Sequence, residues 1–362
     1  MRAFKFLFLS LLVFLNACSP RTPSETVHAG NARTPLVVFA AGSLILPFGE
    51  LEQAFENRFP EIDVQAQYHG SIQVMRHATE LHEPIDVVAT ADAALIPMLM
   101  YATTNPDTGR PYATWFIHFA SNHLALAYGP DSLYADEINA DNWYEVLSRP
   151  YVKVGIPDPR FDAAGYRALM AYALAQAYYN DHGIFTRMFT GNFTYPLGIF
   201  SEGDEQLVIV PEILETEPGS HILIRGASIQ LIALLESGDL DYAFEYESVI
   251  RQHNLELLPL PAALNLGEEV YETDYEKVTV SLEFQRFASV EPEFQGGRIG
   301  YGITIPDSAT HPEEAAQFIA FLLSPEGRAV MERNFHPVFD PPLGNQYRNI
   351  PASLQGLCLP EE

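Results

Sequence analysis

The folded part of the chain opens with LVVFAAGS (residues 36–43), an apolar run that ends in a glycine and a serine. Residues 62–71 have a similar layout, because the alternating stretch IDVQAQY is followed by HGS. A third run, IDVVATAD (residues 85–92), ends in an aspartate. Apolar residues at helical spacing separate these runs, so the pattern predicts parallel strands joined by right-handed crossover helices.

In a parallel sheet the carboxyl ends of the strands lie along one edge, and ligands bind there. Ser43, Ser71 and Asp92 all follow predicted strand ends. Each serine also precedes a predicted helix, whose free N–H groups favour an anion. Taken singly, each serine is more simply explained as a helix N-cap. Taken as a pair in one sheet, Ser43 and Ser71 are predicted to bind a ligand.

The length, composition and charge bound the class of protein and its partners. The chain has 362 residues, of which 48% are hydrophobic, which suits two lobes and excludes a mainly disordered chain. Its 47 acidic residues outnumber 20 basic ones, giving a net charge of -27. This charge argues against nucleic acid or an anionic membrane surface as partner. An anion would therefore be captured by local donors rather than by the global field.

The first eighteen residues are predicted to be a lipoprotein signal peptide. Arg2 and Lys5 precede the apolar run at residues 6–15, which is too short to span a bilayer, and Cys18 follows shortly after. We predict cleavage before Cys18 and lipidation of its thiol; an ordinary secretory signal is the alternative. Residues 19–34 are predicted to be a tether. The expected location is periplasmic or extracellular, with the membrane reached only through the lipid.

The rest of the chain predicts an α/β fold of two lobes linked by hinge crossings. Crossings are expected near residues 117–128 and 255–280, and two such strands permit closure over a ligand. The predicted boundaries are residues 35–118 for the first part of lobe 1, 119–276 for lobe 2, 277–345 for the return to lobe 1, and 346–362 for a C-terminal tail.

The densest polar motif is DPRFDAAGYR (residues 158–167), which joins a predicted strand to a predicted helix. Asp162 lies near the helix N-terminus, where capping alone would explain it. Arg160 and Arg167 add positive charge beside it. Tyr246 ends a later predicted strand, so its phenol would reach a cleft, although a core tyrosine is an equally simple interpretation.

Signals of catalysis are missing from the sequence. We find no Gly-x-Ser-x-Gly elbow, no Walker A loop and no His-Glu-x-x-His motif. We therefore predict that the protein is not an enzyme and has no cofactor. No protein metal site is predicted either, apart from a contact of Asp162 with the metal of a bound oxyanion.

Several motifs in their order and spacing resemble the archaeal-type tungstate/molybdate-binding proteins of the WtpA kind, cousins of the bacterial ModA proteins. The landmarks are AGSL (41–44), HGS (69–71), DVVATAD (86–92), FASN (119–122), NWYEVL (142–147), DP to GYR (158–167) and ESGDLDYAFEY (236–246). The resemblance implies the class II periplasmic-binding-protein fold. It also implies a monomer that captures tungstate or molybdate for the permease and ATPase subunits of an ABC importer.

The sequence departs from that family at the site. In the family two carboxylates approach the metal of the oxyanion; Asp162 matches one, but the position of the other, counted back from Tyr246, holds Ser228. Arg160 stands where the family has an asparagine. We therefore expect a hydrogen-bonded tetrahedral anion with Ser43, Ser71, Ser228 and Tyr246 as donors, and Arg160 paired with Asp162. Sulfate or phosphate binding, or a sensory surface lipoprotein without transport, are the alternatives.

Overall fold

The computed structural model describes residues 33–283 and 292–361, which belong to one compact unit running from Arg33 to Glu362. The predicted signal peptide, Cys18 and all but the end of the tether lie outside the described residues. Strand β1 begins at Thr34, the last residue assigned to the tether. Within the described part, no helix is both long and apolar enough to cross a membrane.

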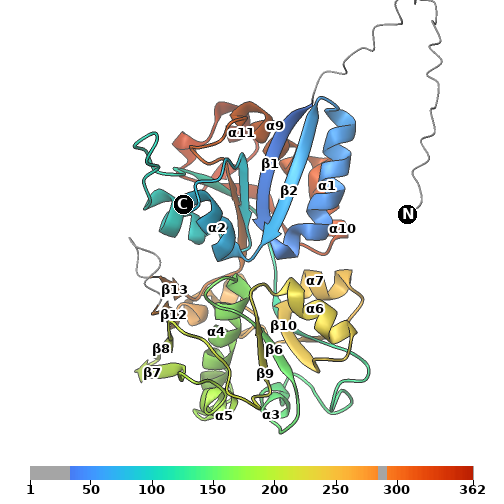
Figure 1. Cartoon of the computed structure of the whole chain (residues 1–362), viewed down its shortest axis with the longest axis vertical. Coiled ribbons are helices and arrows are strands. Elements are labelled where there is room, and N and C mark those ends of the chain that lie inside the picture. Colours follow the sequence, from blue (N-terminus) through green and yellow to red (C-terminus); the bar gives the residue numbers. More distant parts are fainter. Residues whose placement is uncertain (1–32, 284–291, 362) are drawn as a thin grey trace, which may run out of the picture. The chain divides into compact units, whose positions relative to one another are not determined.

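The first lobe is built on a seven-stranded sheet whose strand order is β16-β15-β4-β14-β3-β1-β2 (Figure 1). Its strands are β1 (Thr34–Ala41), β2 (Ile62–His69), β3 (Val87–Thr90), β4 (Phe116–Ser121), β14 (Gly300–Thr304), β15 (Val338–Asn345) and β16 (Leu359–Pro360). Strand β1 pairs in parallel with both β2 and β3, which confirms the predicted β-α-β-α-β start.

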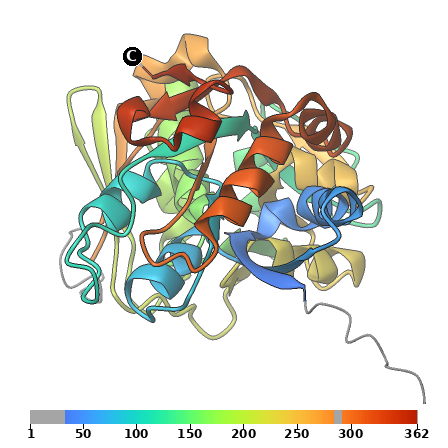
Figure 2. The ribbon, with the colours of Figure 1, turned by 90° about the horizontal axis from the view of Figure 1, so that it is seen from above.

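Helices cover this sheet because their apolar faces need a partner. Phe55 of α1 contacts Phe318 of α9 with ring centroids 5.3 Å apart, and Figure 2 shows these helices in blue and orange. The helical segments of this lobe are η1 (Gly42–Leu44), α1 (Ile45–Arg58), α2 (Ser71–Thr79), η2 (Ile96–Tyr101), α9 (Pro312–Leu323), α10 (Pro325–Arg333), η4 (Tyr347–Asn349) and α11 (Ala352–Gln355).

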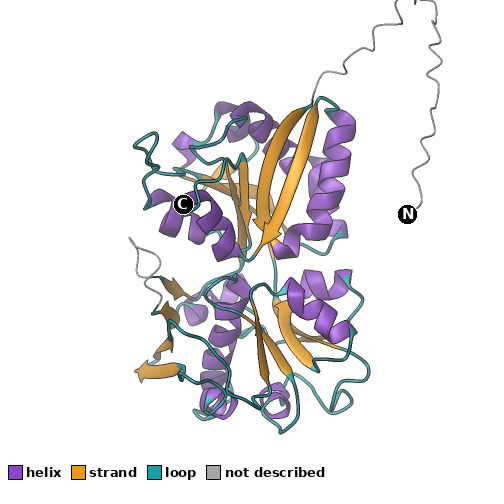
Figure 3. Cartoon of the chain, in the orientation of Figure 1, coloured by secondary structure: helices purple, strands orange, loops and turns teal. Residues whose placement is uncertain are grey.

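The second lobe contains two sheets, with orders β11-β5-β10-β6-β9 and β13-β12-β8-β7 (Figure 3). The strands of the first are β5 (Leu124–Tyr128), β6 (Val154–Pro157), β9 (Ile222–Arg225), β10 (Tyr242–Tyr246) and β11 (Glu256–Pro259). Those of the second are β7 (Gly198–Glu202), β8 (Glu205–Val210), β12 (Val278–Leu282) and β13 (Glu293–Gln295). The accompanying helices are α3 (Trp143–Leu147), α4 (Ala163–Tyr178), α5 (Ile184–Phe189), α6 (Ile229–Glu236), α7 (Glu247–Gln252), η3 (Glu269–Tyr271) and α8 (Glu272–Tyr275).

Helices α4 and α6 pack on opposite faces of strand β10, which is buried along its whole length. Phe244 of β10 contacts Tyr172 of α4, with ring centroids 5.5 Å apart. On the other face, Ala243 packs in a cluster with Leu231 and Leu235 of α6. Because side chains alternate along a strand, Tyr246 shares the α4 face with Phe244, and Glu245 shares the α6 face with Ala243.

The chain crosses between the lobes twice. The first crossing joins β4 to β5 at residues 122–123, inside the predicted range. The second joins β13 to β14 at residues 296–299, later than expected. Strand β12 pairs in parallel with β8, so the expectation that the return to lobe 1 begins at residue 277 is wrong. The predicted C-terminal tail is also partly structured, because β16 pairs with β15 in the first sheet.

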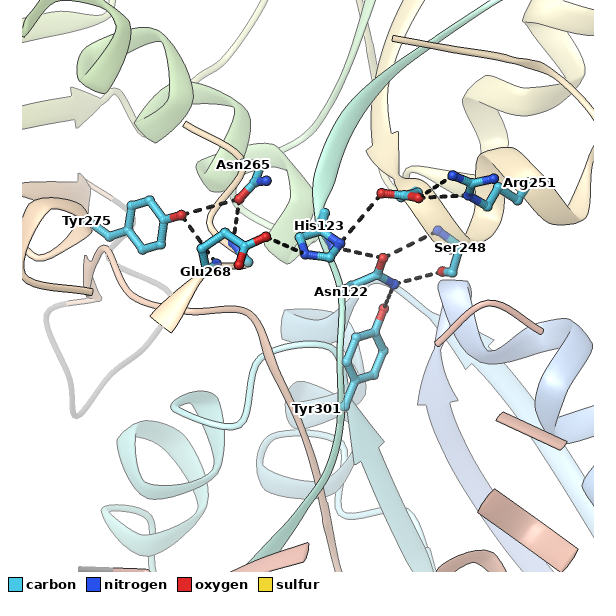
Figure 4. A network of polar contacts seen from close by, with 10 residues as sticks. Asn122, His123, Ser248, Arg251, Asn265, Glu268, Tyr275 and Tyr301 are labelled. Atoms are coloured by element: carbon cyan, nitrogen blue, oxygen red, sulfur yellow. Dashed lines mark hydrogen bonds and ion pairs between the residues drawn. The ribbon is translucent and has the colours of Figure 1, made fainter. Parts of the chain in front are cut away.

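A polar network surrounds the first crossing (Figure 4). The Asn122 amide nitrogen donates to the Ser248 hydroxyl over 2.7 Å and to the Tyr301 hydroxyl over 3.1 Å. The neighbouring His123 ring lies between two carboxylates, 3.5 Å from Glu247 and 3.4 Å from Glu268. The first crossing is thus held by side chains of the second lobe and by Tyr301 on strand β14, where the chain has returned to the first lobe.

Candidate ligand-binding site

Ser43 and Ser71, the two predicted strand-end serines, are both buried, with 3% and 1% of their surface exposed. The Ser43 hydroxyl lies 2.8 Å from the hydroxyl of Tyr301 on β14. The Ser71 hydroxyl accepts a hydrogen bond from the Ala91 amide over 3.1 Å. Neither side chain caps its own helix. The N-cap interpretation is therefore wrong for both, and each hydroxyl makes a hydrogen bond inside the protein instead.

Asp162 and Ser228 are joined although 66 residues separate them in the chain. Asp162 caps helix α4, since its Oδ1 accepts from the Ala164 amide over 2.9 Å. Its Oδ2 accepts from the Ser228 amide, also over 2.9 Å. Burial raises the pKa of Asp162, while the amide of Ser228 and the charge of Arg167 act in the opposite direction. Ser228 is itself 2% exposed and begins helix α6.

Tyr246, at the end of β10, meets a buried arginine. Arg167 of helix α4 is 4% exposed, and its Nη1 donates to the Tyr246 hydroxyl over 2.6 Å and to the Ala91 carbonyl over 2.8 Å. Its Nη2 lies 3.4 Å from the Asp92 carboxylate. A buried guanidinium is costly unless its donors are used, and this network uses them. The result is a positive charge held in the contact between the lobes.

These contacts form one cluster. Arg167 reaches Tyr246 and Asp162 in its own lobe and Ala91 in the other, where the Ala91 amide bonds to Ser71. Tyr301 connects Ser43 to the same region, with its ring centroid 6.2 Å from that of Tyr246. The structure therefore brings together five of the six predicted residues, namely Ser43, Ser71, Asp162, Ser228 and Tyr246.

The sixth predicted residue, Arg160, is not part of the cluster. Its guanidinium pairs with Asp158, at 2.8 Å from Nε and 2.6 Å from Nη2, and donates to the Glu212 carbonyl over 2.7 Å. The expected pair between Arg160 and Asp162 is therefore wrong. Asp158 is close in sequence and presents both of its oxygens to the guanidinium, which is the favoured geometry of such a pair.

The N-terminus of α2 is also used differently from the expectation. The amides of Ile72 and Gln73 donate to the carbonyl of Phe161 in the second lobe, over 3.1 and 3.4 Å. These N–H groups are therefore not free for an anion. Gly70 permits the approach, because a Cβ there would lie 2.3 Å from the Phe161 carbonyl oxygen. The contact joins the lobes directly beside Ser71.

A cavity of about 500 Å³ adjoins the cluster on the side of Arg167. Asp92, Tyr166 and Arg167 belong to its wall, with Glu272 and Arg298 from the returning chain. The Tyr166 hydroxyl donates to the Asp92 carboxylate. Among the residues that the structure describes, no group of three or more His, Cys, Asp or Glu is arranged to hold a metal ion. The donors at the cluster are mainly hydroxyls, amides and one guanidinium, a set that suits an oxyanion.

Sequence reasoning missed three buried members of this region. Arg167 was noted only as positive charge near Asp162, and Tyr301 and Asn122 received no role, although Arg167 and Asn122 fall within the quoted landmarks. A signal for Arg167 was present, since it is an arginine in the otherwise apolar helical stretch AAGYRALMAYALAQAY. Tyr301 has no comparable local signal, because its role depends on β14 returning to pair between β3 and β4.

A fold of two lobes joined by two crossings, with buried hydroxyls and a guanidinium where they meet, is typical of proteins that close over a small solute. The chain matches the family described as bacterial extracellular solute-binding protein over residues 36–335, and it belongs to that family.

The relatives agree with this membership. The chain is 35% identical to an uncharacterized solute-binding protein of Methanococcus maripaludis, covering 96% of this chain and 95% of that one. It is 34% identical to the molybdate/tungstate-binding protein WtpA of Thermococcus kodakarensis, covering 96% and 94%. The predicted resemblance to WtpA-type proteins is thereby confirmed. The fold is similar to that of the Azotobacter vinelandii periplasmic molybdate-binding protein, with a TM-score of 0.51 at 16% identity, covering 83% and 98%.

Proposed function

We propose that this protein captures a tetrahedral oxyanion outside the cell, with tungstate or molybdate as the first candidates. The observation that carries the proposal is Arg167, a buried cation whose donors link both lobes beside the hydroxyls of Ser71 and Tyr246. A dianion between the lobes would be attracted by this charge despite the net charge of -27. The relative WtpA, by its name a molybdate/tungstate-binding protein, supports the same ligand class.

The ligand would be held mainly by hydrogen bonds. Ser43, Ser71, Ser228 and Tyr246 supply hydroxyls, and Arg167 replaces Arg160 as the charge partner. Both oxygens of Asp162 already accept backbone amides, so Asp162 serves first to fix Ser228 and the start of α4. The same observation favours a second candidate, sulfate. If no protein carboxylate binds the central atom of the anion, that atom need not be a metal, and sulfate fits as well.

The role in the cell would be delivery rather than catalysis. We infer that the mature chain is anchored through lipid on Cys18 and presents its ligand to the permease and ATPase subunits of an ABC importer. The family is one of extracellular solute-binding proteins, which supports a location outside the cytoplasm. A sensory role without transport would use the same binding site and differ only in the partner.

Isothermal titration of the mature protein against molybdate, tungstate, sulfate and phosphate tests the proposal. We expect saturable one-to-one binding of molybdate or tungstate, with a dissociation constant below about 1 μM. Tight binding of sulfate and no binding of the metal oxyanions would instead support the second candidate. The absence of binding by all four anions would contradict the proposal.

A further inference from the structure

Glu245 carries a fully buried carboxyl group, with 0% of the residue's surface exposed. It lies between Ser228 and Tyr246, two residues of the proposed site. It follows Phe244 on strand β10 and immediately precedes Tyr246. One of its oxygens, Oε1, accepts a hydrogen bond from the Tyr246 amide over 2.7 Å. The other, Oε2, makes no hydrogen bond of good geometry with the residues that the structure describes. A buried carboxyl oxygen without a partner is costly, so a partner supplied by a ligand is a natural explanation.

The location of Glu245 points to the anion site. Its side chain is on the α6 face of β10, and the hydroxyl of Ser228, the residue that precedes α6, lowers the pKa of Glu245 as a hydrogen-bond donor. Asp162, which accepts from the Ser228 amide, is near enough to raise it. Two carboxyl groups thus approach the position where the resembled family has a glutamate and this chain has Ser228.

Among the described residues, no cation is paired with Glu245. On β5 it is opposite Ala125, and it shares the α6 face of β10 with Ala243, which packs in an apolar cluster with Leu231. The titratable groups around it are Asp162 at the start of α4, Tyr246 on its own strand and Tyr301 on β14. Beyond these, Arg167 is bonded to Tyr246, and Glu247 of α7 is paired with His123.

We propose that Glu245 is a further anion-binding residue, and that it acts as a neutral carboxylic acid whose O–H donates from Oε2 to an oxygen of the bound anion. This inference rests on the proposed function and adds a residue to it. A neutral acid is a donor, whereas a carboxylate is only an acceptor and would repel a dianion. Burial raises the pKa of Glu245 to about 8, which keeps the acid form abundant at neutral pH.

The proposal fixes the direction of proton exchange. At pH values well below 8, Glu245 already carries its proton, so anion binding exchanges none. At about pH 9 most of the free protein has lost this proton, so binding must take one up from solvent. The dissociation constant should then rise toward tenfold for each further pH unit, because the binding-competent acid form becomes rarer by that factor.

The test uses calorimetry of the mature protein with molybdate, in buffers of different ionisation enthalpy, between about pH 6 and pH 9. We expect proton uptake to increase from about zero to about one per molybdate over that range. Glu245→Gln, whose amide is a permanent donor of similar shape, should lose both the proton uptake and the pH dependence of the dissociation constant. Circular dichroism establishes that the variant is folded.

Glu256→Gln is the matched control, since Glu256 is exposed on β11 of the same sheet. It should retain the wild-type pH profile. Proton release at neutral pH, with tighter binding as pH rises, would show that Glu245 binds the metal as a carboxylate and would overturn the proposal. An unchanged profile in Glu245→Gln would overturn it too. If the wild-type protein binds no oxyanion, the proposed function itself fails, and that result is distinct from both.

Discussion

Arg167 donates a hydrogen bond to the Ala91 carbonyl over 2.8 Å, and this bond joins helix α4 of one lobe to the end of strand β3 in the other. The same nitrogen reaches the Tyr246 hydroxyl. One side chain therefore supports both the contact between the lobes and the hydroxyl proposed to bind the anion. The charge at the proposed anion site and one of the contacts between the lobes therefore depend on the same residue.

Replacing Arg167 should impair binding far more than replacing Arg160. Arg167→Ala removes the buried charge, the hydrogen bonds to the Tyr246 hydroxyl and the Ala91 carbonyl, and the cation beside Asp92, so we expect a loss of about 3 kcal/mol, or roughly a hundredfold in affinity. Arg160→Ala should change affinity by less than about threefold, because that guanidinium is paired with Asp158. Titration calorimetry with molybdate measures both.

Folding must be separated from binding in this comparison. Arg167→Lys keeps the charge with fewer donors and should give an intermediate affinity, provided that thermal unfolding shows it to be folded. Equal losses from Arg160→Ala and Arg167→Ala would contradict the assignment of the charge partner.

Gly70→Ala should hinder closure of the lobes. A Cβ at this position would lie 2.3 Å from the Phe161 carbonyl oxygen, so the two lobes must separate to accommodate it. We expect at least tenfold weaker binding of molybdate, or about 1.4 kcal/mol, and a larger radius of gyration by solution scattering. Gly49→Ala is the control, because a Cβ there meets nothing within 4 Å. A Gly70→Ala protein with wild-type affinity and dimensions would show that this contact does not govern closure.

His123 should make the stability of the hinge depend on pH. Its hydrogen bond to Glu247 raises the pKa of His123, and burial opposes this effect. Because the folded-state pKa is raised, the stabilisation is complete below the unfolded value of about 6.5 and is lost as pH rises through the folded-state value. His123→Gln should therefore be less stable than the wild type below about pH 6, with the difference shrinking at higher pH.

Urea unfolding at a series of pH values measures this difference. His182→Gln, at an exposed position in the second lobe, provides the comparison and should follow the wild-type curve. A constant stability difference between His123→Gln and wild type across the series would mean that His123 acts through packing alone.

Cys18 is expected to carry lipid in the mature protein. Mass spectrometry of the N-terminal peptide from membrane fractions should find an acylated Cys18 as the first residue. Cys18→Ser should release the protein from the membrane fraction. A mature chain that starts at another residue would favour the ordinary secretory signal instead.

The early strands and their ends were predictable because their information is local. A buried strand followed by glycine and serine specifies Ser43 and Ser71, and the parallel pairing of β1 with β2 brings those ends together. Asp162 and Tyr246 were recognisable for the same reason, since each lies at the end of a strand or the start of a helix.

The errors arose where long-range pairing decides the outcome. Strand β12 has the pattern of any buried strand, and nothing within residues 278–282 specifies pairing with β8 rather than with the first sheet. Arg160 was matched to Asp162 because the two are close in sequence. Asp158 is equally close, and its carboxylate is the one that accepts from the Arg160 guanidinium. Glu245 lay within a quoted landmark, but its unpartnered oxygen is visible only when the neighbouring helix is in place.

The hydrogen bonds between Phe161 and helix α2 are made by main-chain atoms, because the Phe161 carbonyl accepts from two amides. Exchange of the Ile72 or Gln73 side chain leaves these donors intact, and only proline would remove one. These two hydrogen bonds should therefore persist when the side chains of α2 are substituted. The side chains at the proposed anion site can then be changed without losing this contact between the lobes. A scaffold with such a robust closing contact is a practical starting point for engineering sensors of other anions.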